Sequence, residues 1–138
     1  MDKLKVVLDP GAICPERAHE ADAGYDLYSR DTCFVFAGEH VKFDTGVHVA
    51  IPRGYVGFIR SKSGLMGIDI TSDGTIDSEY TGSIKAVLFN HGKESYLVRK
   101  GDKISQLVLL PIETPEIEIV EQLEDTERGN KGFGSTGR

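Results

Sequence analysis

The hydrophobic positions of this chain fall into many short runs, and turn-forming residues separate one run from the next. Short runs rich in β-branched and aromatic residues are typical of strands. Gly, Asn, Asp or Pro stand between them, in DPG, FAGEH, PRGY, SDGT, NHGKE and RKGDK, where the backbone has to reverse. The pattern therefore predicts an all-β sandwich, jelly roll or barrel. The predicted strands are Lys5–Leu8, Tyr25–Tyr28, Thr32–Phe36, His40–Phe43, Gly46–Ile51, Tyr55–Ile59, Ile68–Thr71, Gly74–Ile76, Ser83–Asn90, Tyr96–Val98, Lys103–Leu110 and Ile117–Val120.

Helical periodicity is nearly absent. SGLMG predicts a single helical turn, and VEQLEDTER predicts a short, frayed helix. The strand segment QLVLLPI is apolar on both faces. Such a strand lies either in the middle of the core or against another subunit, and the sequence leaves both possibilities open.

Length and charge narrow the function classes. With 138 residues the chain fits one domain that buries a proper core. Its net charge of −6 argues against a generally basic nucleic-acid binder. An anionic small ligand would need a locally basic pocket.

The cysteines and histidines suggest neither a disulfide nor a zinc site. Cys14 and Cys33 form no CxxC motif, and a chain of this length does not need a disulfide, so we expect reduced, buried thiols. His48 is expected to be a strand residue with a hydrogen-bond partner; like the other histidines, it lies in no HxH, HxxxH or HExxH pattern. The start MDKLKVVLDPGA lacks the apolar core of a signal peptide, and no apolar run approaches about 18 residues. We therefore expect a cytoplasmic protein without membrane contact.

The last residues, RGNKGFGSTGR, combine glycines with groups that suit a nucleotide. Their GxGxxG spacing is not a dinucleotide fingerprint, because that fingerprint needs a preceding strand and a following helix. Arg128 and Arg138 can pair with phosphate, and Phe133 can stack on a flat ring. Ser135 and Thr136 can donate hydroxyls, so the segment predicts a lid over a nucleoside polyphosphate; the alternative is a solvated tail.

Internal segments offer further polar groups. Asp77 follows a strand and precedes Tyr80 by three positions, so its carboxylate could activate a water beside a slot for a sugar or base, or simply make a turn. RSKSGLMG could place Ser63 as a helix cap and present positive charge to phosphate, or be a solvated basic turn. Gln106 lies in an apolar strand and needs a partner from protein or ligand. Asp26 could hold a water of a magnesium ion, or pair with a neighbouring Arg.

The order of five segments is more specific than any one of them. AGYDLYS, RSKSGL, GTIDSEYTG, GDKISQLVL and RGNKGFGSTG together resemble the five motifs of the trimeric deoxyuridine triphosphatase (dUTPase) family, from about Ala21 to Gly137. The resemblance implies an all-β subunit with a distorted jelly-roll (β-clip-like) fold and a flexible C-terminal arm. Residues 1–126 would form the core and residues 127–138 the glycine-rich arm. It also implies a homotrimer that hydrolyses dUTP to dUMP and pyrophosphate with Mg²⁺, at sites built from all three subunits.

The resemblance also assigns roles to residues. Asp77 is expected to be the general base for water attack on the α-phosphorus, and Asp26 to steer Mg²⁺ through its water shell. The hairpin that contains Thr75 and Ile76 is expected to read uracil through backbone groups, and Tyr80 to pack against deoxyribose and refuse a 2′-hydroxyl. The remaining substrate contacts are expected from Lys62, Ser63, Gly64 and Gln106 in the core, and from Arg128, Phe133, Gly134, Ser135 and Thr136 in the arm.

This chain differs from the family pattern at two places, and the sequence leaves other functions open. The family commonly has Pro-Arg-Ser-Gly where this chain has Ser61-Lys62-Ser63-Gly64, so either Arg60 or Lys62 serves the phosphates. Lys131 replaces a glycine of the arm. The alternatives are a dCTP deaminase-like enzyme, a nucleotide-responsive regulator that binds a partner protein, and a plain structural sandwich.

Overall fold

Short antiparallel strands make up nearly all of the regular structure. A computed structural model describes residues 1–134 and 136–137. Within them lie one helical turn and ten strands, and every strand pair is antiparallel. The elements are β1 (Val6–Leu8), β2 (Gly24–Tyr28), β3 (Cys33–Val35), β4 (His40–Asp44), β5 (Val47–Val49), β6 (Tyr55–Arg60), α1 (Ser63–Met66), β7 (Ile70–Ile76), β8 (Lys85–Asn90), β9 (Tyr96–Val98) and β10 (Lys103–Pro111). In this part of the chain, no helix is long or apolar enough to cross a membrane.

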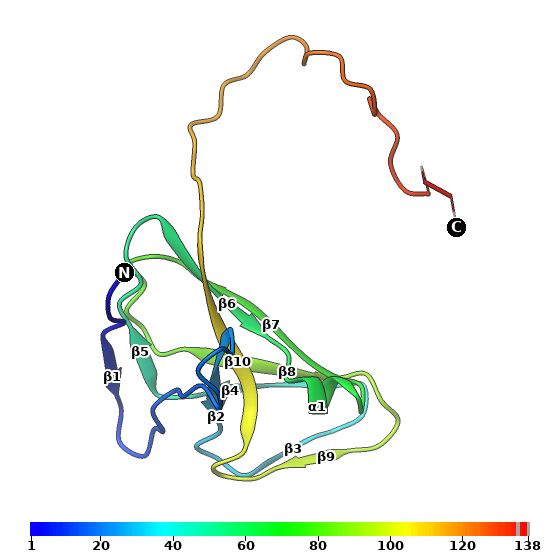
Figure 1. The fold of residues 1–138 in the computed structure, drawn as a ribbon. Helices are drawn as coiled ribbons and strands as arrows, with labels where there is room; N and C mark the ends of the chain where they lie inside the picture. Colours follow the sequence, from blue (N-terminus) through cyan, green and yellow to red (C-terminus); the bar gives the residue numbers. More distant parts are fainter. Residues whose placement is uncertain (135, 138) are drawn as a thin grey trace.

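One large sheet organises the body. Its strand order is β2-β10-β6-β7-β8-β4, and the pairs β1-β5 and β3-β9 form two small sheets beside it (Figure 1). Strand β7 changes partner along its length: Ile70–Ser72 pair with β8, whereas Asp73–Ile76 pair with β6. The prediction of an all-β, jelly-roll-like fold is confirmed.

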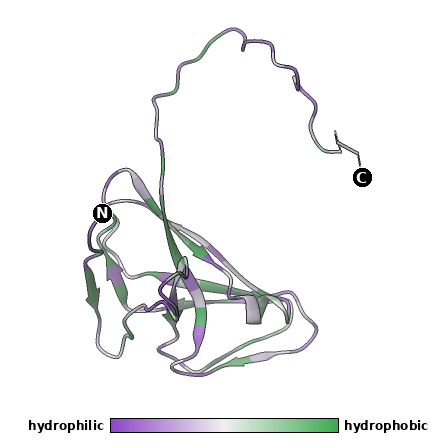
Figure 2. Cartoon of the chain, viewed as in Figure 1, coloured by the Kyte–Doolittle hydropathy of each residue, from purple (hydrophilic) through white to green (hydrophobic). Residues whose placement is uncertain are grey.

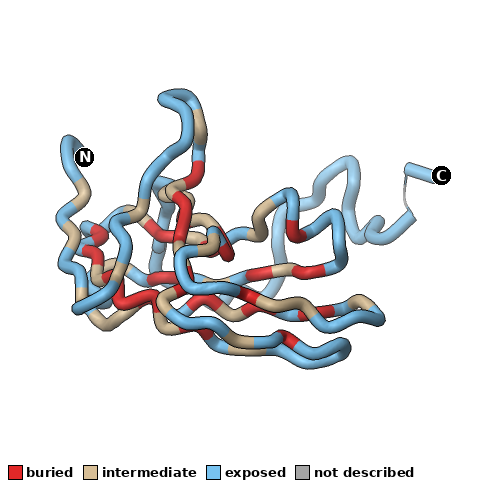
Figure 3. The backbone as a smooth tube through the Cα atoms, turned by 90° about the horizontal axis from the view of Figure 1, so that it is seen from below, coloured by how far each residue is buried: buried red, intermediate tan, exposed pale blue. Residues whose placement is uncertain are grey.

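The core has two neighbouring apolar clusters. One contains Leu27, Ile59 and Leu107, and the other contains Leu88 and Ile104. Because β10 supplies Leu107 to one cluster and Ile104 to the other, this strand joins the two halves of the core. The buried segments in Figure 3 all lie in the body of the molecule, and the described part of the C-terminal segment has none. Farther along QLVLLPI, Leu110 and Ile112 are 39% and 38% exposed, so only part of this strand is buried within the chain.

The SDGT segment was wrongly predicted as a turn. Asp73 and Gly74 lie inside β7, at the point where the strand changes partner. A Cβ on Gly74 would lie 3.2 Å from Cγ1 of Ile59, so this glycine permits close packing against β6 and does not reverse the chain.

Other local predictions also failed. Residues 117–120 form no strand and residues 120–128 no helix, because this part of the chain lies outside the body and has nothing to pair with. The helical turn at SGLMG is confirmed, but its N-cap is Lys62 and no side chain caps it, so Ser63 is not the cap. Cys14 is exposed and Cys33 is half-buried; both are free, but neither is a buried thiol.

After Pro111 the chain leaves the body as a long excursion (Figure 1). Every described residue from Ile112 onward is exposed (Figure 3). Single apolar residues stand among polar ones along its first half (Figure 2), and Ile117 and Ile119 are 90% and 95% exposed. The boundary between core and arm at residues 126 and 127 stays a prediction.

Candidate active site

A row of polar side chains crosses the large sheet. In the strand register Asp26 of β2 lies opposite Gln106 of β10, Gln106 lies opposite Arg60 of β6, and Arg60 lies opposite Asp73 of β7. Residues directly opposite one another on neighbouring strands point to the same face. The sheet therefore gathers one amide, one guanidinium and two carboxylates from four strands onto one face.

Asp26 is the buried end of this row. Its side chain is 4% exposed, and Lys62 Nζ contacts its Oδ1 while Lys103 Nζ lies 3.2 Å from its Oδ2. The hydrogen bond to this carboxylate, together with its charge, raises the pKa of Lys103. Two ammonium groups thus offset the buried charge, where the sequence had suggested an arginine.

The surroundings of Asp26 do not form a cage for a metal ion. Among the described residues, no group of three His, Cys, Asp or Glu side chains converges on one point. Magnesium is commonly held by one or two carboxylates, several waters and the phosphates of a substrate. The residues present fit that arrangement, with Asp26 as the carboxylate, because it does not require a protein cage.

Ser61 connects this row to β7. Its Oγ donates to Ser72 O at 3.0 Å and accepts from Ser72 N at 2.8 Å, while its carbonyl accepts from Gln106 Nε2 at 2.9 Å. The partner of Gln106 is therefore protein. A Cβ on Gly24 would lie 2.0 Å from Gln106 Oε1, so only glycine leaves room for this amide. Ser63 and Gly64 follow directly in α1, where the first N–H groups have no acceptor within the helix.

A second group of side chains lies beyond the end of β7. Asp77 is exposed, and its carbonyl accepts from Tyr80 N at 3.2 Å, which closes a turn. Glu79 in this turn has φ 68°, and its N–H donates to Ile51 O at 3.1 Å. A cavity of about 330 Å³ opens here, lined by Thr75, Ile76, Asp77, Tyr80, Ser83 and Lys85. The structure thus brings the predicted base and the predicted sugar-packing ring together.

Polar contacts hold the far side of this cavity. Tyr80 Oη donates to Ser83 O at 3.0 Å, and Ser83 Oγ donates to Asp44 Oδ1. The Ser83 hydroxyl and the N–H of Gly46, followed by the Arg30 guanidinium, lower the pKa of Asp44. A Cβ on Gly82 would lie 2.4 Å from Tyr80 Oη, so a side chain at this position would displace the ring.

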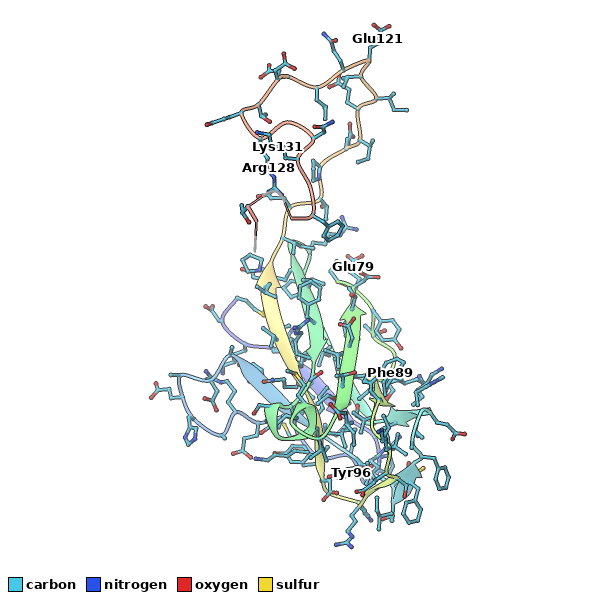
Figure 4. The ribbon with its side chains drawn as sticks, turned by 90° about the vertical axis from the view of Figure 1, so that its right-hand side faces the viewer. Glu79, Phe89, Tyr96, Glu121, Arg128 and Lys131 are labelled. Atoms are coloured by element: carbon cyan, nitrogen blue, oxygen red, sulfur yellow. The ribbon has the colours of Figure 1, made fainter. Side chains whose placement is uncertain are left out.

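The arm carries a third group. Arg128, Phe133, Gly134 and Thr136 line a cavity of about 520 Å³ together with Gly132, and Phe133 is fully exposed. Arg128 Nε donates to Lys131 O at 2.8 Å, and the two residues lie side by side on the arm above the body in Figure 4. Ser135 and Arg138 lie outside the described residues.

The polar row and the cavity beside Asp77 lie at different points along the chain. Asp73, the member of the row in β7, lies four residues before Asp77, a backbone separation of about 13 Å at a rise of about 3.3 Å per residue. In the described part of the chain these are therefore two separate groups of polar residues, and the arm residues form the third.

The sequence did not single out four residues of these groups. Ser61 and Lys103 support the polar row, and Ser83 and Lys85 line the cavity beside Asp77. Lys103 stands in the quoted segment GDKISQLVL, but only the pairing of β10 with β2 brings its ammonium to Asp26.

Lys62→Met is expected to destabilise the fold, because it leaves the buried Asp26 with Lys103 alone. We expect a loss of about 1–2 kcal/mol of unfolding free energy, less than the about 3–5 kcal/mol for a fully buried pair, since Lys62 is 28% exposed and Lys103 remains. Urea denaturation measures this loss. Lys42→Met, at an exposed position of β4, is the control. Equal denaturation midpoints for wild type and Lys62→Met would show that the ion pair does not stabilise the fold.

Comparison with known proteins places this arrangement in a family. A family model described as dUTPase matches residues 11–137. The deoxyuridine 5'-triphosphate nucleotidohydrolase of Paramecium bursaria Chlorella virus 1 is 44% identical over 129 residues, which is 91% of each chain. The solved structure of the Staphylococcus bacteriophage 80alpha dUTPase with dUPNHPP has a TM-score of 0.94, 35% identity and full coverage of both chains.

A second solved structure concerns a metal. It is a mutant dUTPase from phage phi11 of S. aureus, described for the coordination of a structural Mg(II) ion. Its TM-score is 0.83 at 32% identity, covering 90% of this chain and all of that one. The matches span nearly the whole chain, including all three groups of polar residues. This chain is a member of the dUTPase family.

Proposed function

We propose that this chain hydrolyses dUTP to dUMP and pyrophosphate, with Asp77 as the general base. The observation that carries the proposal is the cavity at the end of β7, which pairs the Asp77 carboxylate with the Tyr80 ring. Asp77 accepts a proton from a water molecule while the oxygen of that water attacks the α-phosphorus. The bond between the α-phosphorus and the oxygen that bridges it to the β-phosphorus then breaks, and pyrophosphate leaves. The Asp77 side chain is exposed, so a water molecule can reach its carboxylate, as this role requires.

Uracil and deoxyribose are proposed to bind in the same cavity. The backbone of Thr75 and Ile76 lies along its wall and can hydrogen-bond the edge of uracil. Tyr80, whose hydroxyl donates to Ser83 O, is proposed to pack against the sugar and to refuse a 2′-hydroxyl. This contact would let the protein select dUTP over UTP.

The phosphates are proposed to bind on the polar row. Ser63, Gly64 and Gln106 supply hydrogen bonds there, and Lys62 offsets negative charge beside Asp26. The Arg60 guanidinium is exposed in the same row, whereas the Lys62 ammonium is held by Asp26. Arg60 is therefore the better candidate for direct phosphate contact. When bound, Mg²⁺ would neutralise phosphate charge, with Asp26 holding its water shell.

We propose a homotrimer with shared active sites, and the separation of the groups supports this proposal. If the polar row of one subunit faces the Asp77 cavity of a second, both can contact one nucleotide despite the backbone separation of about 13 Å within one chain. The exposed apolar residues Leu110 and Ile112 offer surface for such contacts.

The arm, residues 127–138, is proposed to close over a site formed by the other two subunits. Arg128, Ser135 and Thr136 would contact phosphates, Phe133 would stack on uracil, and Gly134 with φ 77° would allow the backbone to fold down. Ordering costs about 1–2 kcal/mol per residue, so closure requires bound nucleotide. We place this activity in the cytoplasm.

Product analysis tests the proposal. The protein is mixed with Mg²⁺ and, separately, dUTP, dCTP, dTTP and UTP, and released pyrophosphate and ammonia are measured. We expect pyrophosphate from dUTP alone and none after chelation of Mg²⁺. Ammonia from dCTP would support the deaminase alternative, and absence of any product would overturn the enzyme assignment.

A further inference from the structure

His48 of β5 lies between two oxygen acceptors from separate parts of the fold. Its Nδ1 is 2.7 Å from Thr81 O, and its Nε2 is 3.0 Å from Asp9 Oδ1. Asp9 directly follows β1, and Thr81 directly follows Tyr80 in the loop that carries Asp77. The imidazole thus connects the small β1-β5 sheet to the loop whose residues Asp77 and Tyr80 line the proposed uracil cavity.

The charge state of the ring decides whether both contacts are favourable. A carbonyl and an ionised carboxylate accept hydrogen bonds but do not donate them. The imidazolium carries N–H groups on both nitrogens and satisfies both acceptors. The neutral ring has one N–H, so one acceptor then faces a lone pair.

We infer that His48 is a positioning residue, whose imidazolium ties the loop Asp77–Ser83 to Asp9 and so holds Asp77 and Tyr80 in place for the proposed reaction. This inference rests on the proposed function for its catalytic consequence. The tie itself is a property of the fold, and it can be measured without substrate.

The other long-range anchors of this loop are at Ser83 and Glu79. At the end of the loop, Ser83 Oγ donates to Asp44 Oδ1 and accepts from Gly46 N at 3.1 Å. Glu79 N donates to Ile51 O, and the Glu79 carboxylate pairs with Arg53 at 2.9 Å, but both of these side chains are largely exposed. Exposed ion pairs contribute little. The His48 side chain is 26% exposed, so its contacts are better shielded from solvent.

The electrostatic surroundings favour the charged ring. The hydrogen bond to Thr81 O and then that to Asp9 raise the pKa of His48, and the charges of Asp9 and Asp44 act in the same direction. Desolvation of the ring acts in the opposite direction. The cations nearby are Lys5, which lines the same cavity as His48, and Arg30, which donates to Pro10 O beside Asp9. A raised pKa means that the tie is complete below the ordinary titration range of histidine and is lost as pH rises through the raised value.

The experiment compares the wild type with Asp9→Asn, His48→Ala and the control His19→Ala, which alters an exposed histidine of another loop. Hydrogen exchange of residues 77–84, corrected for its intrinsic pH dependence, is measured across the titration of the His48 ring followed by NMR. The kcat/KM for dUTP is measured over the same pH range.

For the wild type and His19→Ala, loop protection and kcat/KM should both fall as His48 loses its proton, with kcat/KM falling about tenfold for the loss of one charge-assisted hydrogen bond. In His48→Ala, loop protection and kcat/KM should both be low at every pH and should not fall further over this pH range, so this step is absent. Asp9→Asn should lose the step but keep the protection, because its amide can donate to the neutral Nε2 while Nδ1–H still donates to Thr81.

Equal loop exchange in the wild type on both sides of the His48 titration would overturn the inference, as would an unchanged step in Asp9→Asn. A step in loop exchange without any dUTP hydrolysis would support the tie and overturn the proposed function instead. The two failures are therefore distinguishable.

Discussion

Asp77→Asn should lower kcat for dUTP by about 10²–10⁴-fold, the contribution of a positioned general base. Asparagine is nearly isosteric and keeps the turn, since the Asp77 carbonyl, and not its carboxylate, accepts from Tyr80 N. The amide does not take the proton of the attacking water. Because the cavity wall is otherwise unchanged, affinity for a non-hydrolysable dUTP analogue should stay close to that of the wild type. Pyrophosphate release measures the first quantity and calorimetry the second.

Asp31→Asn is the control for this variant. Asp31 also carries an exposed carboxylate, but it lies between β2 and β3, outside the polar row and the cavity beside Asp77. The Asp31→Asn variant should retain nearly all of the wild-type turnover. Wild-type turnover in Asp77→Asn would remove Asp77 from the role of base, and equal losses in both variants would indicate a general effect of lost negative charge.

Removal of residues 128–138 should leave a folded oligomer with little activity. The deleted arm makes no described contact with the body of its own chain, so the unfolding transition should be unchanged (Figure 4). Loss of the Phe133 stack and the Arg128 contact removes roughly 3–6 kcal/mol of nucleotide binding, which corresponds to about 10²–10⁴-fold in kcat/KM. Steady-state kinetics and thermal denaturation of the truncated and full-length proteins measure the two effects.

Point variants test whether the truncated protein loses activity through the missing aromatic ring or through the shorter chain. Phe133→Ala should lose about 1–3 kcal/mol of nucleotide-binding free energy, whereas Phe133→Trp keeps an aromatic face and should bind nucleotide nearly as well as the wild type. Full activity of the truncated protein would make the arm an ordinary solvated tail. An unfolded truncated protein would show that the arm stabilises the fold.

The strands could be predicted from local sequence because their apolar runs are short and bounded by turn residues. Strand β8 was predicted within two residues of its observed start and β9 at both ends. The failures arose where a distant partner decides the structure. SDGT contains strong turn residues, yet β6 and β8 hold it in a strand, and Gly74 serves close packing against Ile59.

The extended residues 117–120 show the opposite case. Their composition favours a strand, but a strand needs a neighbour to receive its backbone hydrogen bonds. Within the described chain these residues lie outside the body, and Ile119 is 95% exposed. Local propensity alone therefore did not make a strand there.

The sequence by itself determined the all-β class, the family and the residue types of the site, because these depend on short-range patterns and on motifs in a fixed order. Only the tertiary structure decided that Lys62 and Lys103 share Asp26, that His48 bridges Asp9 and Thr81, and that the site residues form three separate groups. Those facts depend on which strands pair and in what register. Pairing is set by burial of the whole core and not by the neighbours of each residue along the chain.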